Sequence, residues 1–215
     1  MAGSADRLPT DARAVVLGQI RDALADQPTT AGIPRDYDRA LPAGTDTAGL
    51  FVERVSHYRA TVHRTTAAGL PAAIAAVLAA RGATRLAVPA GIPDPWLAGT
   101  GAERVADDPL LSYVALDRLD GVITGCAVAI AETGTIILDG GPGQGRRALS
   151  LLPDLHLCIV RADQVVGSVP EALARLAPTR PQTWISGPSA TSDIELQRVE
   201  GVHGPRILEV ILVEE

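Results

Sequence analysis

The chain has 215 residues, of which 47% are hydrophobic but only 3% are aromatic, and its formal net charge at pH 7 is −6. A chain of this length can bury a sizeable core in one domain. The negative charge argues against nucleic acid or an anionic membrane as a general partner, because both bind clustered positive charge. No apolar run approaches the roughly 18 residues of a membrane span, and the N-terminus lacks an apolar signal core, so we expect a soluble, cytoplasmic protein.

The chain contains two cysteines, Cys126 and Cys158, and both lie in apolar runs. Two cysteines are too few for a disulfide framework or a thiolate metal cage, and no CxxC motif is present. We therefore expect both to be small buried hydrophobic residues. We also expect this chain to bind no metal or cofactor of its own.

The N-terminal region differs in composition from the rest of the chain. Residues 1–10 are predicted to be disordered, and apolar residues then recur at helical spacing over 11–25. Residues 26–47 hold several prolines and glycines, which predicts an extended arm. We therefore divide the chain into an N-terminal helix and arm, 1–47, and an α/β domain, 48–215. The arm is either an ordinary loose extension or a segment that binds a partner.

The first half of the α/β domain has a strand–helix–strand pattern. An apolar face at 51–58 predicts a helix, β-branched alternation at 60–65 predicts a strand, and 70–82 predicts a second helix with a proline start and a glycine end. Residues 85–89 form the next predicted strand. This order is typical of a parallel sheet with helices on its faces. Residues 91–109 are predicted to be mainly loop.

The second half contains the longest apolar runs. Residues 121–131 have few charges and no helical face, which predicts one strand buried on both sides. A turn at 132–134 and a returning strand at 135–139 predict a hairpin. The predicted fold class is therefore α/β, with a mixed, mostly parallel sheet flanked by helices. The remaining predicted elements are strands at 155–160, 182–185 and 206–213 and a helix that begins at 169.

The stretch from 184 to 205 is dense in hydroxyl, glycine and proline residues. A Gly-Pro turn at 187–188 is followed by Ser192-x-x-Glu195, which has the spacing of a helix capping box. We therefore predict a short helix that ends at Gly201, with free amides that could hold an anion. The plainer alternative is that the hydroxyls only cap this helix.

This stretch also resembles a known family. Ser-Gly-Pro-Ser-x-Thr-x-Asp-Ile-Glu at 186–195, followed by Gly-Val-His-Gly-Pro at 201–205, is similar to the C-terminal signature of the lactate-utilisation (LUD) domain family, in its lactate utilization protein C branch. Ala-Glu-Thr-Gly-Thr at 131–135 is a second match in the expected order, and the resemblance covers roughly residues 48–213. It implies a fold like that of the ribose-phosphate isomerase and CoA-transferase group (NagB/RpiA/CoA-transferase-like). It also implies a role in oxidising L-lactate to pyruvate beside two partner subunits that carry iron–sulfur clusters.

Two residues are candidates for catalysis. Glu132 follows a long apolar run and lies in a turn, where a carboxylate in apolar surroundings would suit proton transfer. Alternatively it only accepts hydrogen bonds from the turn amides. His203 lies in a Gly-Val-His-Gly-Pro frame and could donate to a carboxylate or act as a base. A bonded turn histidine is the alternative there.

Several neighbouring residues are candidates for ligand binding. Thr133 and Gly134 adjoin Glu132, and Arg146 ends a glycine-rich loop where it could clamp a carboxylate or phosphate. A flexible tip with solvated arginines is the alternative for that loop. The remaining candidates, from the C-terminal stretch, are Ser189, Thr191 and Asp193.

The sequence lacks the motifs of several enzyme classes. It has no Gly-x-Ser-x-Gly elbow, no Walker A loop and no dinucleotide fingerprint. An electron acceptor for lactate oxidation therefore lies on a partner or binds without a recognised motif.

Three hypotheses remain open. The chain is a component of an L-lactate oxidation system, a stand-alone enzyme of the isomerase or CoA-transferase type, or a scaffold whose arm docks a partner. In the first two, the turn with Glu132 and the C-terminal stretch would form one pocket for a small anion.

Overall fold

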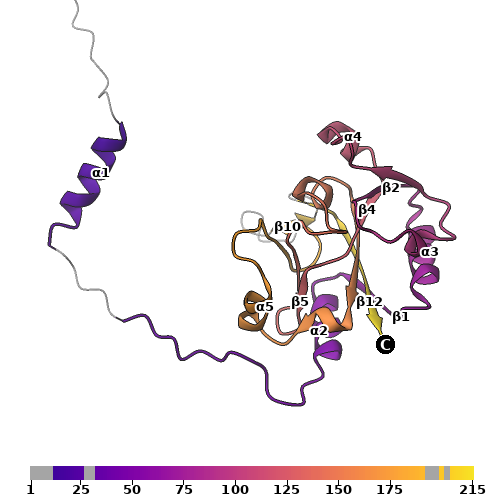
Figure 1. The fold of residues 1–215 in the computed structure, drawn as a ribbon, viewed down its shortest axis with the longest axis horizontal. Helices are drawn as coiled ribbons and strands as arrows, with labels where there is room; N and C mark the ends of the chain where they lie inside the picture. The colour runs from indigo at the N-terminus through magenta and orange to yellow at the C-terminus, as the bar shows by residue number, and fades with distance from the viewer. Residues whose placement is uncertain (1–11, 27–31, 192–198, 201–203) are drawn as a thin grey trace, which may run out of the picture. The chain divides into compact units, whose positions relative to one another are not determined.

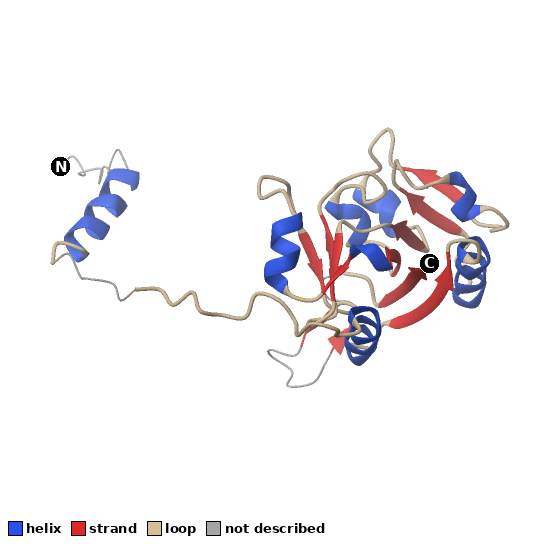
Figure 2. Cartoon of the chain, turned by 60° about the horizontal axis from the view of Figure 1, so that its bottom comes forward, coloured by secondary structure: helices blue, strands red, loops and turns tan. Residues whose placement is uncertain are grey.

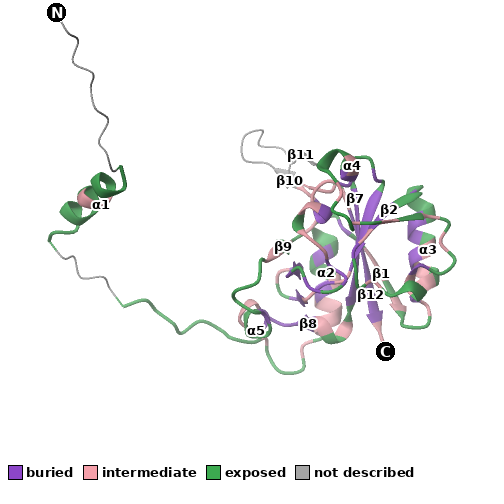
Figure 3. Cartoon of the chain, turned by 45° about the horizontal axis from the view of Figure 1, so that its top comes forward, coloured by how far each residue is buried: buried purple, intermediate pink, exposed green. Residues whose placement is uncertain are grey.

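A computed structural model describes residues 12–26, 32–191, 199–200 and 204–215. The chain divides into two units, Met1–Tyr37 and Asp38–Glu215. In the first unit, helix α1 (Ala12–Ala23) has no buried residues and most of it is exposed, drawn in green in Figure 3. The helix predicted at 11–25 is therefore confirmed. The disorder predicted for 1–10 concerns residues outside those described.

The second unit is built around a sheet in which all six described strands run parallel. Its two central strands are buried on both faces (Figure 3), as expected for a parallel sheet covered by helices. The strands predicted near 60, 85, 155 and 206 all belong to it. In spatial order they are β1 (Thr61–Thr66), β12 (Ile207–Glu214), β7 (Leu155–Arg161), β4 (Gly121–Thr124), β2 (Arg85–Val88) and β3 (Glu103–Ala106). Figure 1 labels four of these strands, β1, β12, β4 and β2.

A smaller sheet of four described strands packs beside the first. It contains the predicted hairpin, whose strands β5 and β6 pair antiparallel. The predicted α/β class, with a mostly parallel central sheet flanked by helices, is confirmed, and the hairpin belongs to a second, mixed sheet. In order, the second sheet is β8 (Val165–Val166), β5 (Val128–Ile130), β6 (Thr135–Leu138) and β9 (Thr183–Ile185).

The division into two sheets corrects the prediction of one strand at 121–131. The chain leaves the first sheet after Thr124 and enters the second at Val128. Between them, the Gly125 amide donates to the Gly143 carbonyl instead of to a neighbouring strand. Both halves of the run are buried and apolar, so hydropathy alone did not reveal the change of sheet.

Helices cover the first sheet on opposite faces (Figure 2). One face, with Leu157 and Ile159, packs against α3 (Leu70–Arg81). The other, with Cys158 and Val160, packs against α2 (Thr47–His57) and the second sheet. Both cysteines are buried, as predicted. The remaining helices are α4 (Tyr113–Asp117), α5 (Val169–Arg175) and the 3₁₀ turns η1 (Asp94–Leu97), η2 (Arg147–Ser150) and η3 (Ala162–Gln164).

Two predictions about local structure need amendment. Residues 91–109 are mostly loop, as predicted, but also contain η1 and the edge strand β3. The C-terminal stretch forms a small antiparallel pair, β10 (Ala190–Thr191) and β11 (Val199–Glu200), where the end of a helix was predicted. The capping box from Ser192 to Glu195 lies outside the described residues. The described part of this stretch therefore contains no helix N-terminus that could bind an anion.

Candidate functional site

A cavity of about 260 Å³ lies where the two sheets meet. The N-terminal ends of β7 and β12 form its floor, through the paired residues His156 and Leu208. Both lie on the face of the first sheet that packs against the second sheet, because side chains alternate along a strand. Across the cavity stand β9 and the loop after it. The polar side chains in its wall include Arg147, Ser150, His156, Thr183 and Ser189.

His156 is the buried titratable group of this cavity. It is 1% exposed, and its Nε2 lies 2.7 Å from Thr124 Oγ1. Burial lowers the pKa of His156 to about 4, because the charged imidazolium is poorly solvated there. The imidazole is therefore neutral at pH 7.

The second ring nitrogen of His156 faces the cavity. The described side chains include no fully buried nitrogen or oxygen atom without a hydrogen-bond partner. Because Nε2 contacts Thr124 and His156 lines the cavity, Nδ1 is the ring atom that remains accessible from it. A neutral imidazole can donate or accept at Nδ1, depending on which of Nε2 and Thr124 donates in the other bond.

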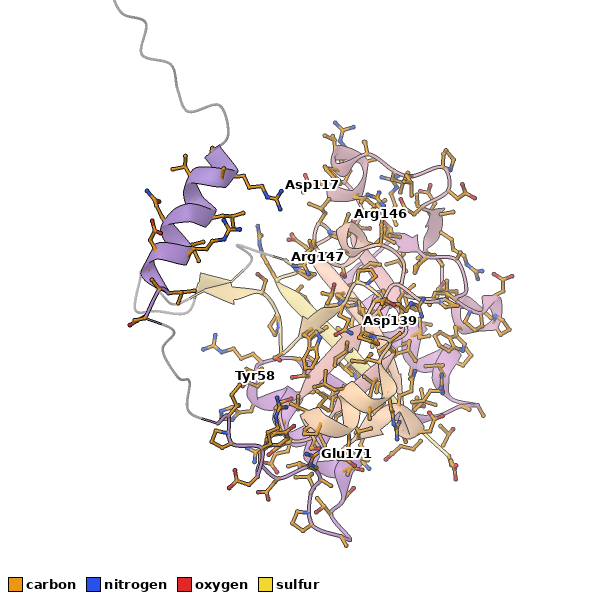
Figure 4. The ribbon with its side chains drawn as sticks, turned by 60° about the vertical axis from the view of Figure 1, so that its left-hand side comes forward. Tyr58, Asp117, Asp139, Arg146, Arg147 and Glu171 are labelled. Atoms are coloured by element: carbon orange, nitrogen blue, oxygen red, sulfur yellow. The ribbon has the colours of Figure 1, made fainter. Side chains whose placement is uncertain are left out.

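The two arginines of the glycine-rich loop have different roles (Figure 4). Arg146 donates to both carboxylate oxygens of Asp107, at 2.6 and 3.0 Å, and to the Leu111 carbonyl at 2.6 Å. The hydrogen bonds from Arg146 to Asp107 hold the pKa of the Asp107 carboxyl below its usual range. The guanidinium of Arg146 is therefore occupied by a structural ion pair, and the ligand clamp predicted for it is not supported.

Arg147 is the cationic side chain that the cavity wall presents. Its Nη1 makes one long hydrogen bond, 3.4 Å, to Thr183 Oγ1. A guanidinium has five N–H donors, so most of its capacity is available to a carboxylate. Within the described wall of the cavity no carboxylate side chain neutralises it.

The glycine-rich loop before Arg147 is held in place by side chains. Gln144 accepts from the Asp139 amide at 2.6 Å, and Asp139 accepts from the Gly141 amide and from Arg180. These hydrogen bonds order the loop, whereas the Arg147 side chain at its end is exposed, as the alternative with solvated arginines expected. The ordered loop sets the position from which Arg147 reaches the cavity.

The hairpin corner lies beside the cavity but does not line it. Glu132 is exposed, and its amide donates to the Gly167 carbonyl at 3.0 Å, so the apolar surroundings expected for it are not found. Gly134 is buried against the backbone of α2, at a positive φ of 59°. Thr133 is connected to the loop after β9 through two hydrogen bonds, from Thr133 to Thr135 at 2.7 Å and from Thr135 to Ser186 at 2.8 Å.

The candidates from the C-terminal stretch are only partly described. Ser189 lines the cavity, and its amide donates to the Pro205 carbonyl, which brings the two halves of the motif together. Thr191 lies in β10, and only its backbone is described. Asp193 and His203 lie outside the described residues, so their predicted roles stay predictions.

Two cavity residues, Arg147 and His156, were not among the predicted site residues. Arg147 belongs to the arginine pair that ends the glycine-rich loop, of which only Arg146 was chosen, and His156 and its partner Thr124 were assigned to strands. The available signal was a polar residue in a strongly apolar run, Leu-His-Leu-Cys-Ile-Val. A buried polar side chain needs a partner, and a strand start places it near an open edge.

The described residues offer no obvious metal site. Across 12–26, 32–191, 199–200 and 204–215, no group of three or more His, Cys, Asp or Glu side chains is placed to hold a metal ion. Cys126 and Cys158 are buried as free thiols, and the hydrogen bond with the Cys158 thiol, together with burial, raises the pKa of Cys126. None of the helices described has the length and apolar character of a membrane span.

Comparisons of the sequence and of the structure with known proteins point to the same family. Residues 112–213 match the sequence profile of the LUD domain. The chain is 57% identical over 167 residues to lactate utilization protein C of Deinococcus radiodurans, covering 76% of this chain and 77% of that protein. It is 37% identical over 94 residues to lactate utilization protein C of Bacillus pumilus, covering 40% and 39% of the two chains. A crystal structure of a DUF162 family protein from Deinococcus radiodurans matches 78% of this chain and 96% of its own, with 47% identity and a TM-score of 0.68.

Proposed function

Because this chain belongs to the LUD domain family, we propose that it takes part in lactate utilisation and that its cavity binds a small 2-hydroxy or 2-oxo carboxylate. The names of its relatives support the pathway. The observation that supports the ligand class is that a cation, Arg147, and a neutral, buried imidazole, His156, line the same cavity.

The two side chains would recognise the two ends of such an acid. Arg147 would bind the carboxylate by charge-assisted hydrogen bonds. His156 would bind the C2 oxygen through Nδ1, accepting from the hydroxyl of L-lactate or donating to the carbonyl of pyruvate. Thr124 makes both possible, because its hydroxyl can accept from Nε2 or donate to it.

The oxidation of lactate also removes two electrons, for which the proposal needs an acceptor. We assign it to partner subunits that carry iron–sulfur clusters, because the two buried cysteines of this chain are unsuited to hold one. In this arrangement the present chain supplies the carboxylate pocket. Redox chemistry takes place only in the assembled system.

Ligand binding can be measured on the purified chain by titration calorimetry with L-lactate and pyruvate. Arg147→Gln should weaken both at least about tenfold, because a charge-assisted hydrogen bond is lost. Arg104→Gln is the matched control, since Arg104 forms only an exposed ion pair with Asp94 outside the cavity. Equal affinity in the two variants, or no binding by the unaltered chain, would contradict the proposed ligand site.

The pathway can be tested separately in cells. Deletion of the gene, in a strain with no second lactate dehydrogenase, should abolish growth on L-lactate but leave growth on pyruvate. The unaltered gene and the Arg104→Gln variant should restore growth, whereas Arg147→Gln should not. Normal growth of the deletion strain on L-lactate would rule out the proposed role.

A further inference from the structure

A second hollow adjoins the cavity on the other side of Arg147. Its volume is about 420 Å³. Arg147, Ser150 and Thr183 line both spaces, so the long bond between Arg147 and Thr183 lies at the boundary between them. The two hollows therefore share part of their walls at the guanidinium, and together they are called the groove.

The second hollow is less polar in its chemistry than the first. The residues that line it alone are Leu138, two glycines of the ordered loop, Pro181 and Arg146. The charge of Arg146 is offset by Asp107, which lies at 2.6 Å. The described wall of this hollow contains no carboxylate side chain and no histidine. An uncharged, aliphatic group is what such a surface accepts best.

The size of the groove also argues for a ligand larger than lactate. A three-carbon acid fills only part of the 260 Å³ cavity and leaves the second hollow empty. Binding sites for ligands of moderate size span roughly 300–1,000 Å³, a range that the two hollows reach together.

We infer that the site takes 2-hydroxy or 2-oxo acids with an aliphatic side chain longer than the methyl group of lactate. The inference rests on the proposed function, since it uses the same carboxylate site. The carboxylate binds Arg147, the C2 oxygen faces His156, and the side chain extends past Thr183 into the hollow beside Leu138 and Pro181.

The test is a chain-length series in titration calorimetry. L-lactate, 2-hydroxybutanoate and 2-hydroxyhexanoate are compared on the unaltered chain. Each buried methylene should tighten binding roughly threefold to fourfold, so 2-hydroxyhexanoate, with three more methylenes, should bind roughly thirtyfold or more tighter than lactate. Equal affinities across the series would overturn the inference while leaving the proposed lactate site intact.

Two substitutions of Pro181 test whether the side chain of the bound acid lies in the second hollow. Pro181 is exposed and lines only the second hollow, so Pro181→Trp should fill that hollow and bring the affinity for 2-hydroxyhexanoate down to that for lactate. Pro181→Ala removes the ring without filling the space and should keep the chain-length preference. If Pro181→Trp weakened the binding of all three acids equally, the inference would be overturned. Failure of the unaltered chain to bind any of the acids would overturn the proposed ligand site as well.

Discussion

At the scale of single residues, the buried His156 of the cavity makes the free energy of unfolding depend on pH. The pKa of this side chain is about 4 in the folded chain against an ordinary 6.5. Between those values the unfolded chain binds a proton that the folded chain does not, so the free energy of unfolding falls as the pH is lowered from 6.5 to 4. The expected loss over this window is about 3 kcal/mol, and it is absent above pH 6.5.

This prediction is measured by urea denaturation at pH 7.5 and pH 4.5. The unaltered chain should lose about 3 kcal/mol more of its free energy of unfolding between the two pH values than His156→Gln does. His57→Gln, an exposed site on α2, is the control and should behave like the unaltered chain. Parallel losses in the unaltered chain and in His156→Gln would show that the imidazole is not held neutral by burial.

At the scale of elements, the tip of the β5–β6 hairpin is fitted against α2 at Gly134. A Cβ there would lie 2.8 Å from the backbone of Arg54 and Val55, and φ is 59°. Gly82 has a similar φ of 63° but no atom within 4 Å of its Cβ position. Gly82→Ala should therefore cost only the strain of a left-handed backbone, about 1 kcal/mol, whereas Gly134→Ala should cost at least about 1 kcal/mol more.

The comparison separates conformational strain from close packing. Both variants are measured by thermal and urea denaturation under one set of conditions. Equal destabilisation of the two would mean that the hairpin does not pack closely on α2. The hydroxyl chain from Thr133 to Ser186 would then have no rigid support, since it depends on the same corner.

At the scale of the whole molecule, the compact unit includes part of the predicted arm. The Ser168 hydroxyl donates to the Arg39 carbonyl at 2.8 Å, and the Leu41 side chain packs at Gly167. A chain of residues 38–215 should therefore keep the stability of the full chain. A chain of residues 42–215, which retains the Asp46 cap of α2, should lose about 1–2 kcal/mol of its free energy of unfolding.

Urea denaturation of the two truncated chains, beside the full chain, measures this difference. If both are as stable as the full chain, residues 38–41 add nothing to the fold, and the division predicted at residue 47 describes it better. If the 38–215 chain is already destabilised, the first unit contributes to the stability of the second.

Most elements were predictable from local sequence, because each carries its own pattern. The helices α2 and α3, the parallel strands and the hairpin follow from apolar periodicity and from glycine and proline positions. The family motif also identified the loop with Ser189, which does line the cavity. Local patterns do not distinguish two buried strands from one, so the break between Thr124 and Val128 was missed.

The sequence by itself determined the α/β class, the parallel direction of the main strands and the burial of both cysteines, because these depend on which residues avoid water. Only the tertiary structure decided which polar side chains meet. Arg146 and Arg147 are adjacent in sequence, yet one is neutralised by Asp107 and the other faces the cavity. The reason is that charge pairing depends on residues about forty positions away, such as Asp107, whose approach is set by packing and not by local pattern.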